Sequence, residues 1–506
     1  MKKPIKLLVS LVSILSLVSC GGNSTSTATG SGSNAGTSTS TNGGDYDDVS
    51  KAGDKEIQFW HCIGHDKMRN LERIIEKFNE AHKNTDGYQV KAYQIAGAYD
   101  DLHDAVKTKL NAGYVPSITM GYPDSFAEYI GTNGAENSTI LDLTSYINND
   151  SNFKKDDFVT EYYDEGTHYQ YDGTYSLPLY KSTEVMYYNK TAYEASDFYK
   201  AHKDDTYGNY GAKISDPSTW DWDTLIYVAG EIQKENKNTS DFHALGYDSD
   251  SNLFISQMAQ RNIPYTTATT SGSTSDEQKV SHFQFATINN GTFTPNSDLV
   301  SLTQEIYDLT TAGTLVTQGS YGSYASDLFK KKKVMFTVGS TGGSAYNEPG
   351  DAFVCGISKV PAYHNVQKYI MQGPSLCFFN TKDTKKEAAA WDFYVNYIAD
   401  TDLNAQLALE NSYDPVKKAS YDTTSYTEWI DEGKTESGKE DLKAELKYRI
   451  PALTSTLKDS YMTSPVFIGS STARTQIGKL ISYAKENGGD VSKAIQKAWE
   501  NCALAA

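Results

Sequence analysis

The chain has 506 residues, which exceeds what one core usually holds and predicts about two to four domains. With 46 Lys and Arg against 64 Asp and Glu, the formal charge is −18, which argues against a nucleic-acid partner because phosphate binding needs a basic surface. The composition is that of a folded chain, and no apolar run of membrane-spanning length follows the N-terminus. Tyrosine is unusually frequent, at 37 against 18 Phe, and its ring and hydroxyl suit surfaces that grip polar ligands as well as wet cores.

The N-terminus has the layout of a secretory signal. Lys2, Lys3 and Lys6 form a positive start, and residues 5–19 are almost entirely Leu, Val, Ile and Ser. The apolar stretch is too short to span a bilayer as a mature helix. The sequence therefore predicts a signal peptide at 1–19 and a protein that acts outside the cytoplasm.

The end of this signal, Leu17-Val18-Ser19-Cys20, resembles the bacterial lipoprotein signal. The resemblance implies that Cys20 is lipidated and becomes the mature N-terminus; an ordinary signal with a chance cysteine is the alternative. Residues 21–44 contain only Gly, Ser, Thr, Asn and Ala, so we expect 20–53 to be a flexible tether. Loss of the three leader lysines takes the net charge to −21, so the lipid rather than charge must hold the body on the outer face of the cell membrane.

The remaining cysteines match no metal or redox motif. Cys355 and Cys377 are the nearest pair in sequence, and the sequence leaves a bridge between them open. His61 and His65 have the i, i+4 spacing of metal ligands, but no third ligand is in view. We therefore expect neither a metal nor a cofactor.

The start of the body alternates strands and helices. Period-two residues at 56–60 predict a strand, and apolar residues at three- and four-residue steps over 68–78 predict a helix. A second strand (88–95), a second helix (102–110) and a third strand (116–120) follow. This βαβαβ order predicts an α/β lobe whose ligand site lies at the carboxyl ends of its strands.

The rest of the body is less regular. Residues 195–217 and 264–298 are rich in small and polar residues and are expected to be loops, and 334–338 predicts a short strand before a Gly-rich turn. Residues 386–409 predict a long helix, and 420–445 a charged, exposed segment. Two helices, 477–484 and 491–502, are expected to end the chain.

Several segments, in this order, are similar to the extracellular solute-binding proteins of bacterial ABC importers. They most resemble solute-binding protein family 1, which includes carbohydrate-binding and glycerol-3-phosphate-binding proteins. The order and approximate spacing match over about residues 55–502. The segments are Ile57 to His61, Gly97 to Leu102, Tyr175 to Leu179 with Ser182 to Lys190, Pro217 to Trp220, Gln372 to Ser375, Ala388 to Trp391, and Tyr413 to Val416.

The resemblance implies an α/β, two-lobed periplasmic-binding-protein-like fold of type II, with hinge strands and a ligand cleft between the lobes. The first lobe would comprise 54–178 plus 334–381, and the second 179–333 plus 382–506. The protein would be a monomeric receptor that captures a mono- or oligosaccharide and delivers it to the transmembrane subunits of an ABC permease.

The resemblance also implies which residues meet the ligand. Trp60 and His61 follow the first strand, where the family places ligand-facing groups. Tyr99 and Tyr122 match tyrosines of the family's pocket, and Ser182 matches a hydroxyl that contacts ligand.

Three further positions belong to the same implied pocket. Gly339 and Ser340 would present a backbone N–H and a hydroxyl. Tyr413 lies in the family's aromatic-then-Pro loop and is the strongest single candidate.

Two positions depart from the phosphate-binding members of the family. Arg474 lies near their phosphate-binding Arg, but the register is off by one. Pro123 stands where they carry an acidic residue, which Asp124 could replace only with a shift. These departures favour a neutral saccharide, with glycerol 3-phosphate or a glycerophosphodiester as the alternative ligand.

An enzyme and a surface sensor or adhesin are the two alternatives to a transport receptor. The chain has no GxSxG, HExxH, P-loop or GxGxxG motif, although a secreted glycosidase needs only two carboxylates. A surface sensor or adhesin could use the same fold without transport. We expect a binding protein and not an enzyme.

Overall fold

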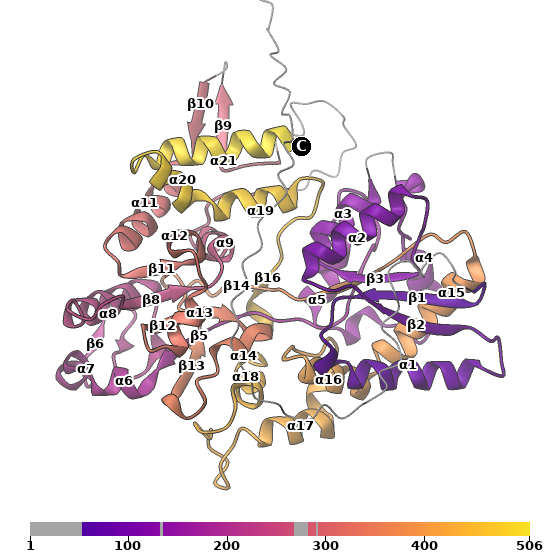
Figure 1. Ribbon diagram of the computed structural model, residues 1–506, viewed down its shortest axis with the longest axis horizontal. Coiled ribbons are helices and arrows are strands. Elements are labelled where there is room, and N and C mark those ends of the chain that lie inside the picture. The colour runs from indigo at the N-terminus through magenta and orange to yellow at the C-terminus, as the bar shows by residue number, and fades with distance from the viewer. Residues whose placement is uncertain (1–52, 132–134, 268–281, 290–291, 506) are drawn as a thin grey trace, which may run out of the picture. The chain divides into compact units, whose positions relative to one another are not determined.

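The computed structural model describes residues 53–131, 135–267, 282–289 and 292–505. The predicted leader 1–19, the lipidation site Cys20 and all but the last residue of the predicted tether 20–53 lie outside these residues. The described part holds two five-stranded sheets, each with its own helices, and the chain crosses between them more than once (Figure 1).

The first sheet has the strand order β2-β1-β3-β15-β4. β1 pairs in parallel with β2 and β3, whereas β15 runs antiparallel to β3 and β4. β1 is buried along almost its whole length, which is typical of a parallel strand covered on both faces. The strands are β1 (Glu56–His61), β2 (Gln89–Gln94), β3 (Ile118–Gly121), β4 (Leu177–Pro178) and β15 (Ser375–Phe378).

A helix follows each of the first three strands, and the first two are the helices that the hydrophobic period predicts. α1 buries Leu71, Ile74 and Phe78, which recur at three- and four-residue steps on one face. The predicted βαβαβ order is thereby confirmed. The helices are α1 (Arg69–His82), α2 (Tyr99–Asn111) and α3 (Pro123–Ile130).

The second sheet has the strand order β11-β8-β12-β5-β13. β8 runs parallel to β11 and β12, and β5 is antiparallel to both of its neighbours. Its strands are β5 (Glu184–Asn189), β8 (His243–Tyr247), β11 (Leu315–Thr317), β12 (Val334–Ser340) and β13 (Cys355–Lys359).

The lobe boundaries differ from the prediction at two places. The sequence predicts residues 334–359 in the first lobe, but β12 and β13 pair with β5 in the second sheet. It predicts the segment from 382 in the second lobe, but α15 (Thr384–Phe393) packs against β1 and α16 (Thr401–Glu410) against α1. An apolar pattern indicates that a segment is buried, but it does not indicate which sheet the segment joins.

The crossings between the sheets are tied by backbone hydrogen bonds. The chain leaves the first sheet after β4 and returns between β13 and β15. Ser182 and Gln372 exchange two backbone hydrogen bonds of 2.8 Å, and Lys181 and Asp414 exchange two of 3.0 and 2.6 Å. Beside them lies a small parallel pair of strands, β14 (Tyr369–Ile370) and β16 (Tyr461–Met462).

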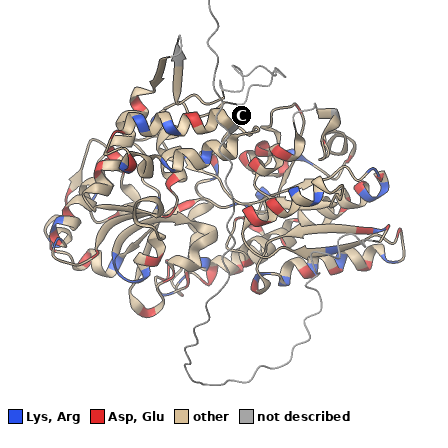
Figure 2. Cartoon of the chain, turned by 45° about the horizontal axis from the view of Figure 1, so that its top comes forward, with Lys and Arg blue, Asp and Glu red and all other residues tan. Residues whose placement is uncertain are grey.

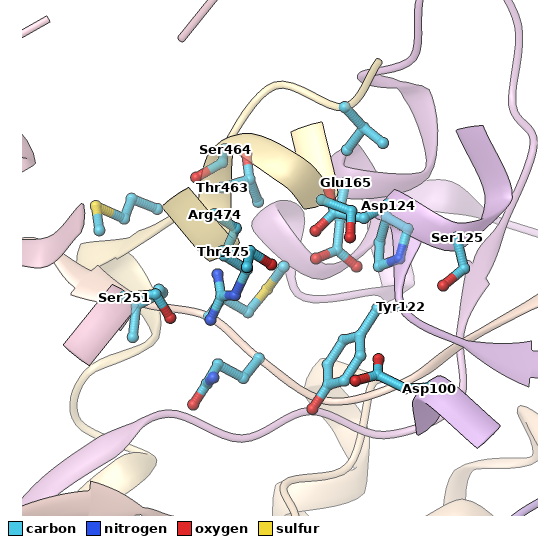
Figure 3. Close-up of a pocket in the computed structure, with 17 residues that line it drawn as sticks. Asp100, Tyr122, Asp124, Ser125, Glu165, Ser251, Thr463, Ser464, Arg474 and Thr475 are labelled. Carbon is cyan, nitrogen blue, oxygen red and sulfur yellow. The ribbon is translucent and has the colours of Figure 1, made fainter. Parts of the chain in front are cut away.

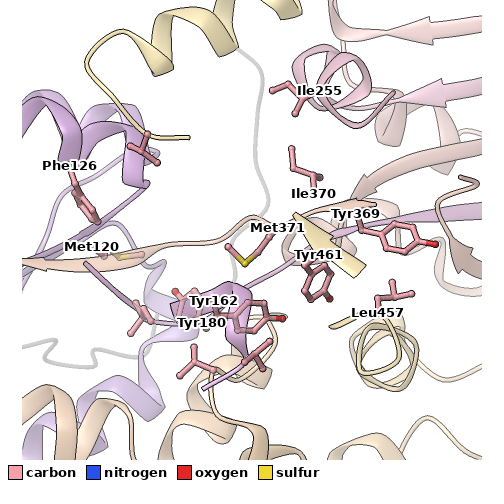
Figure 4. Close-up of a cluster of buried hydrophobic side chains, with 14 of the residues drawn as sticks. Met120, Phe126, Tyr162, Tyr180, Ile255, Tyr369, Ile370, Met371, Leu457 and Tyr461 are labelled. Atoms are coloured by element: carbon pink, nitrogen blue, oxygen red, sulfur yellow. The ribbon is translucent and has the colours of Figure 1, made fainter. Parts of the chain in front are cut away.

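One cluster of buried hydrophobic side chains runs through these crossings. Tyr162 and Tyr180 belong to it from the side of the first sheet, together with Met371, Tyr369 and Tyr461 at the crossings (Figure 4). The two sheets therefore share a packed core at the point where the chain passes between them.

The remaining helices depart from the prediction in detail. The expected single helix 386–409 is divided into α15 and α16 by a π-helical turn at Tyr394–Ile398. The expected loop 195–217 contains α7, and the final helix is α21. The other helices are α4 (Thr144–Asn149), α5 (Thr160–Asp164), α6 (Lys190–Ala195), α7 (Asp197–His202), α8 (Trp222–Glu235), α9 (Asp250–Gln260), α11 (Ser297–Thr311), α12 (Gln318–Tyr321), α13 (Ala325–Lys330), α14 (Ser344–Asn347), α17 (Thr424–Asp431), α18 (Leu446–Thr454), α19 (Ser470–Gly478), α20 (Leu480–Glu486) and α21 (Val491–Ala505).

Besides β14 and β16, four short strands of the described residues lie outside the two sheets and form two antiparallel pairs. They are β6 (Thr206–Tyr207) with β7 (Ala212–Lys213), and β9 (Ala286–Asn289) with β10 (Thr292–Pro295). The first pair lies within the expected loop 195–217, and the second lies within the expected loop 264–298, part of which is outside the described residues.

The four cysteines of the described body are free thiols. Cys355 lies in β13 and Cys377 in β15, so the two belong to different sheets. Within the described ranges, three potential metal ligands do not come together, and none of the helices is long and apolar enough to cross a bilayer. Acidic and basic residues are interspersed over both sheets and their helices (Figure 2).

Candidate ligand-binding site

A cavity of about 300 Å³ lies where the two sheets meet the crossings. α2 and the start of α3 form one wall, and α9 and α19 form the opposite wall (Figure 3). The crossings and the chain after β16 form the remainder. The lining residues are Asp100, Tyr122, Pro123, Asp124, Ser125, Glu165, Ser251, Ile370, Met371, Gln372, Met462, Thr463, Ser464, Val466, Ser471, Arg474 and Thr475.

Tyr122 owes its position to the sheet. It directly follows β3, at the carboxyl end of a parallel strand, where α/β folds place their ligands. Pro123 then opens α3, because a proline lacks the N–H that the first turn of a helix leaves unpaired. The strand end thus turns Tyr122, Asp124 and Ser125 toward the cavity.

Arg474 is held by a chain of buried polar groups. Its Nη2 donates to Asn252 Oδ1. Asn252 Nδ2 in turn donates to Glu184 Oε1 over 2.7 Å, and Tyr247 Oη donates to Glu184 Oε2 over 2.6 Å. Burial raises the pKa of Glu184 to about 7. The guanidinium is therefore fixed from behind and presents its remaining donors to the cavity.

The opposite wall carries carboxylates. Asp124 Oδ1 accepts a hydrogen bond of 2.8 Å from Ser470 Oγ, which connects α3 to α19. Burial raises the pKa of Asp124, against the opposing effects of Arg474 and this hydrogen bond. The carboxylates of Asp124 and Glu165 and the guanidinium of Arg474 all lie around one pocket (Figure 3).

Glu165 is paired with a fully buried lysine. Lys181 Nζ contacts Glu165 Oε2 and also donates to Gly373 O over 3.2 Å and to Ser375 Oγ over 2.9 Å. Burial lowers the pKa of Lys181, and the charge of Glu165 opposes that shift. The pair joins the wall of the cavity to the crossing that begins at Lys181.

A cluster of tyrosines lies next to the cavity. The hydroxyls of Tyr99 and Tyr413 are 3.4 Å apart, and the ring centroids of Tyr180 and Tyr413 are 4.4 Å apart. The ring of Tyr122 lies 4.5 Å from that of Tyr99. Burial raises the pKa of all four hydroxyls, so they stay protonated at neutral pH and can both donate and accept hydrogen bonds.

The structure places the sequence-predicted residues in three groups. Tyr122 and Arg474 line the cavity. Tyr99 and Tyr413 belong to the adjoining tyrosine cluster. The other five, Trp60, His61, Ser182, Gly339 and Ser340, are outside the set that lines the cavity.

These five residues have structural contacts of their own. Trp60 is fully buried, and burial lowers the pKa of His61 to about 4, so that this ring is neutral at physiological pH. Ser182 pairs with the crossing at Gln372. Gly339 lies so close to Asp248 that a Cβ there would stand 2.8 Å from the carboxylate oxygen.

Several lining residues were not singled out from the sequence. Glu165 follows α5 directly and carries no motif, and Met371 and Met462 reach the cavity only because the crossings bring them there. In sequence, Asp124 matches the acidic position of the phosphate-binding relatives only with a shift of one residue. Its position one residue after a strand-end tyrosine and proline is the one local signal that pointed to it.

Comparison with known proteins identifies the family. The sequence model of the family described as bacterial extracellular solute-binding protein matches residues 73–432. The chain belongs to this family. It is a solute-binding protein of an ABC importer, it acts outside the cytoplasm, and it is not an enzyme.

The individual relatives are distant. The chain is 24% identical, over 379 residues, to the sn-glycerol-3-phosphate-binding periplasmic protein UgpB of Rhizobium meliloti (strain 1021), covering 73% of this chain and 77% of that protein. UgpB from Mycobacterium tuberculosis, solved in complex with glycerophosphocholine, matches with a TM-score of 0.63 at 14% identity over 90% of this chain and 98% of that one.

A sugar-binding protein has the same fold. The cyclic alpha-maltosyl-1,6-maltose binding protein from Arthrobacter globiformis matches with a TM-score of 0.61 at 16% identity, over 90% of this chain and 99% of that chain. At these identities the structural matches establish the two-lobed fold alone.

Proposed function

We propose that this protein captures a carbohydrate between its lobes and delivers it to the transmembrane subunits of an ABC permease. The observation that carries the proposal is the composition of the cavity wall, which combines acceptors, donors and apolar surface around about 300 Å³. Most of the residues in this wall are polar or charged, which suits a ligand that carries many hydroxyl groups.

The chemistry of the wall matches that of a sugar. Asp124 and Glu165 can accept hydrogen bonds from sugar hydroxyls, and Arg474 can donate them. Tyr122 offers a ring, and Met371 and Met462 offer flexible apolar contacts, for the C–H face of a pyranose. A saccharide presents both kinds of surface on the same molecule.

We propose that the residues that line the cavity contact the ligand directly and that the neighbouring tyrosines extend the site. Tyr122 and Arg474 contact the ligand directly, and Tyr99 and Tyr413 extend the site toward the second sheet. A longer saccharide that reaches this cluster would approach Gly339 and Ser340 at the end of β12. Trp60, His61 and Ser182 support the site from behind.

A second candidate ligand is glycerol 3-phosphate or one of its diesters. Arg474 favours it, since a guanidinium binds phosphate well, and UgpB proteins are among the relatives. The carboxylates of Asp100, Asp124 and Glu165 around the same cavity argue against a phosphate group.

Native mass spectrometry of the freshly purified protein tests the proposal, followed by thermal unfolding with a panel of saccharides and glycerol phosphodiesters. A saccharide at 100 times its Kd should stabilise the fold by about 2.7 kcal/mol. Stabilisation by phosphodiesters alone would select the second candidate. A panel without any stabilising ligand would contradict both.

We further propose that the protein is a monomer attached to the outer face of the cell membrane through a lipid on Cys20. The leader, the glycine- and serine-rich segment 21–44 and the acidic body support this arrangement. Wild-type protein should fractionate with membranes and carry the mass of a diacylglyceryl group, whereas Cys20→Ala should be released. Equal release of both forms would contradict the anchor. Light scattering of the released form should give the mass of one chain.

A further inference from the structure

Negative charge exceeds positive charge around the ligand cavity. Asp100 lies at its rim, and Asp124 and Glu165 are on its wall. Among the described residues that line the cavity, Arg474 is the one cation. A ligand without charge would leave this imbalance in a partly enclosed space, where charges are screened less than in bulk water.

The charge of Arg474 is already shared among protein carboxylates. Its guanidinium is bonded to Asn252, which bridges it to the buried Glu184, and Asp124 faces it across the cavity. Lys181 in the same way is paired with Glu165. Glu184, whose raised pKa of about 7 leaves it largely protonated at slightly acidic pH, adds little negative charge. Arg474 and Lys181 then face the three carboxylates that line the cavity, Asp100, Asp124 and Glu165.

Two acceptors in the wall have no donor within the described residues. Glu165 is 8% exposed, and its hydrogen bonds from Lys181 and Ser375 both end on Oε2, which leaves Oε1 without one. Gln372 Oε1 is buried without a partner, whereas Glu165 Oε1 keeps some solvent exposure. A buried acceptor normally has a donor, so the ligand is expected to bring N–H or O–H groups to this wall.

We propose that the captured saccharide carries a protonated amino group, which lies between Asp124 and Glu165. This inference rests on the proposed function. An ammonium brings three N–H donors and one positive charge, and so supplies what this wall lacks in both hydrogen bonds and charge. The sugar ring then faces Met371 and Met462, and its hydroxyls face the Ser and Thr side chains of α19.

Matched oligosaccharides test the inference by titration calorimetry on the full body of the protein. The probes are β-1,4-linked glucosamine oligomers of one to four units, their N-acetylated forms, and the corresponding glucose oligomers, at slightly acidic pH and low salt. At each length that binds, the ammonium form should bind at least about tenfold more tightly than both neutral forms, and added salt should reduce this preference.

Variants locate the effect. Asp124→Asn keeps the acceptor for Ser470 but removes the charge, and should lower the preference to less than about threefold. Asp351→Asn makes the same charge change at an exposed position outside the cavity and should leave the preference unchanged. If Asp124→Asn does not fold, the affinity of the wild-type protein for ammonium forms relative to neutral forms still tests whether the ligand carries an amino group.

The outcomes separate the two levels of the argument. If neutral sugars bind and the ammonium forms bind no better, the inference is overturned and the proposed carbohydrate function stands. If no saccharide of any kind binds, both are overturned. A preference that survives Asp124→Asn would also overturn the assignment of the amino group to this wall.

Discussion

The ring of Tyr413 lies so close to Gly342 that a Cβ on the glycine would stand 2.7 Å from the tyrosine Cζ. Tyr413 follows α16, which packs on the first lobe, and Gly342 follows β12 of the second sheet. The pair is thus a contact between lobes, and glycine is needed there for space. Closing of lobes by hinge motion around a ligand depends on such contacts.

Gly342→Ala should therefore oppose closure. Overpacking of this kind costs about 1–3 kcal/mol, which would weaken ligand binding by about 5- to 150-fold without unfolding either lobe. Calorimetry with the identified ligand, together with small-angle scattering with and without it, measures the effect. Gly343→Ala is the matched control, since its nearest neighbour would be Tyr346 at an ordinary 3.6 Å. Equal affinities for both variants would show that the contact does not limit closure.

The buried pair of Lys181 and Glu165 predicts an asymmetric response to mutation. Lys181→Met leaves the Glu165 carboxylate without its cation and should lower the free energy of unfolding by about 3–5 kcal/mol. Lys181→Met combined with Glu165→Gln should cost less than Lys181→Met alone, because no buried charge is then left unpaired. Urea unfolding of the three proteins measures this. A double variant as unstable as the single one would argue that packing, and not charge, is lost.

Asp414 predicts a pH dependence of stability. Burial raises its pKa from 3.8 to about 7, and its Oδ2 has no hydrogen-bond partner within the described residues. Between these two values the folded protein holds a proton that the unfolded chain has released. This group therefore favours folding at low pH, and its contribution falls as pH rises from about 4 to about 7, by up to about 1.4 kcal/mol per pH unit.

Asp414→Asn should remove this contribution. The variant should be more stable than wild type at pH 8, and its free energy of unfolding should fall less steeply between pH 4 and pH 7. Glu184, whose pKa is also raised to about 7, should leave part of the slope in place. Parallel curves for wild type and variant would show that Asp414 does not carry a proton in the folded state.

Tyr122→Phe tests the ligand site at one hydroxyl. The ring and its contact with Tyr99 should remain, and the loss of one hydrogen bond to the ligand should weaken binding by about 2- to 13-fold. Tyr346→Phe, at a tyrosine that is 68% exposed and outside the cavity, should change nothing. Calorimetry compares the three proteins, and unchanged affinity for Tyr122→Phe would remove its hydroxyl from the site.

The sequence was sufficient for the strands and helices that begin the body and for part of the site. The βαβαβ start could be predicted because its periods are strong, and Tyr122 could be found because it directly follows a buried strand. The membership of β12 could not be predicted, because a hydrophobic run is equally compatible with either sheet.

Residues that come together only where the chain crosses between the sheets could not be predicted from local sequence patterns. Glu165 is far in sequence from Lys181 and Gln372, and only the fold brings the three residues together at the cavity. Trp60 and His61 show the opposite case. They are the last two residues of β1, where the sequence predicts site residues, yet their side chains are buried in the interior. A position at the end of a strand does not determine whether the side chain faces the cavity or the core.

The late position of β15 in the chain has a consequence for how the protein is assembled. β3 pairs with β15, so the first sheet stays incomplete until residues 375–378 have been synthesised, long after the strands of the second sheet have begun. Until then Ile118–Gly121 has an open edge that can pair with another chain. Pairing over such a distance in sequence is slow. A nascent or truncated chain that ends before β15 is therefore exposed to aggregation at this edge, and a deletion at 375–378 would leave β3, far away in the sequence, without one of its two neighbouring strands.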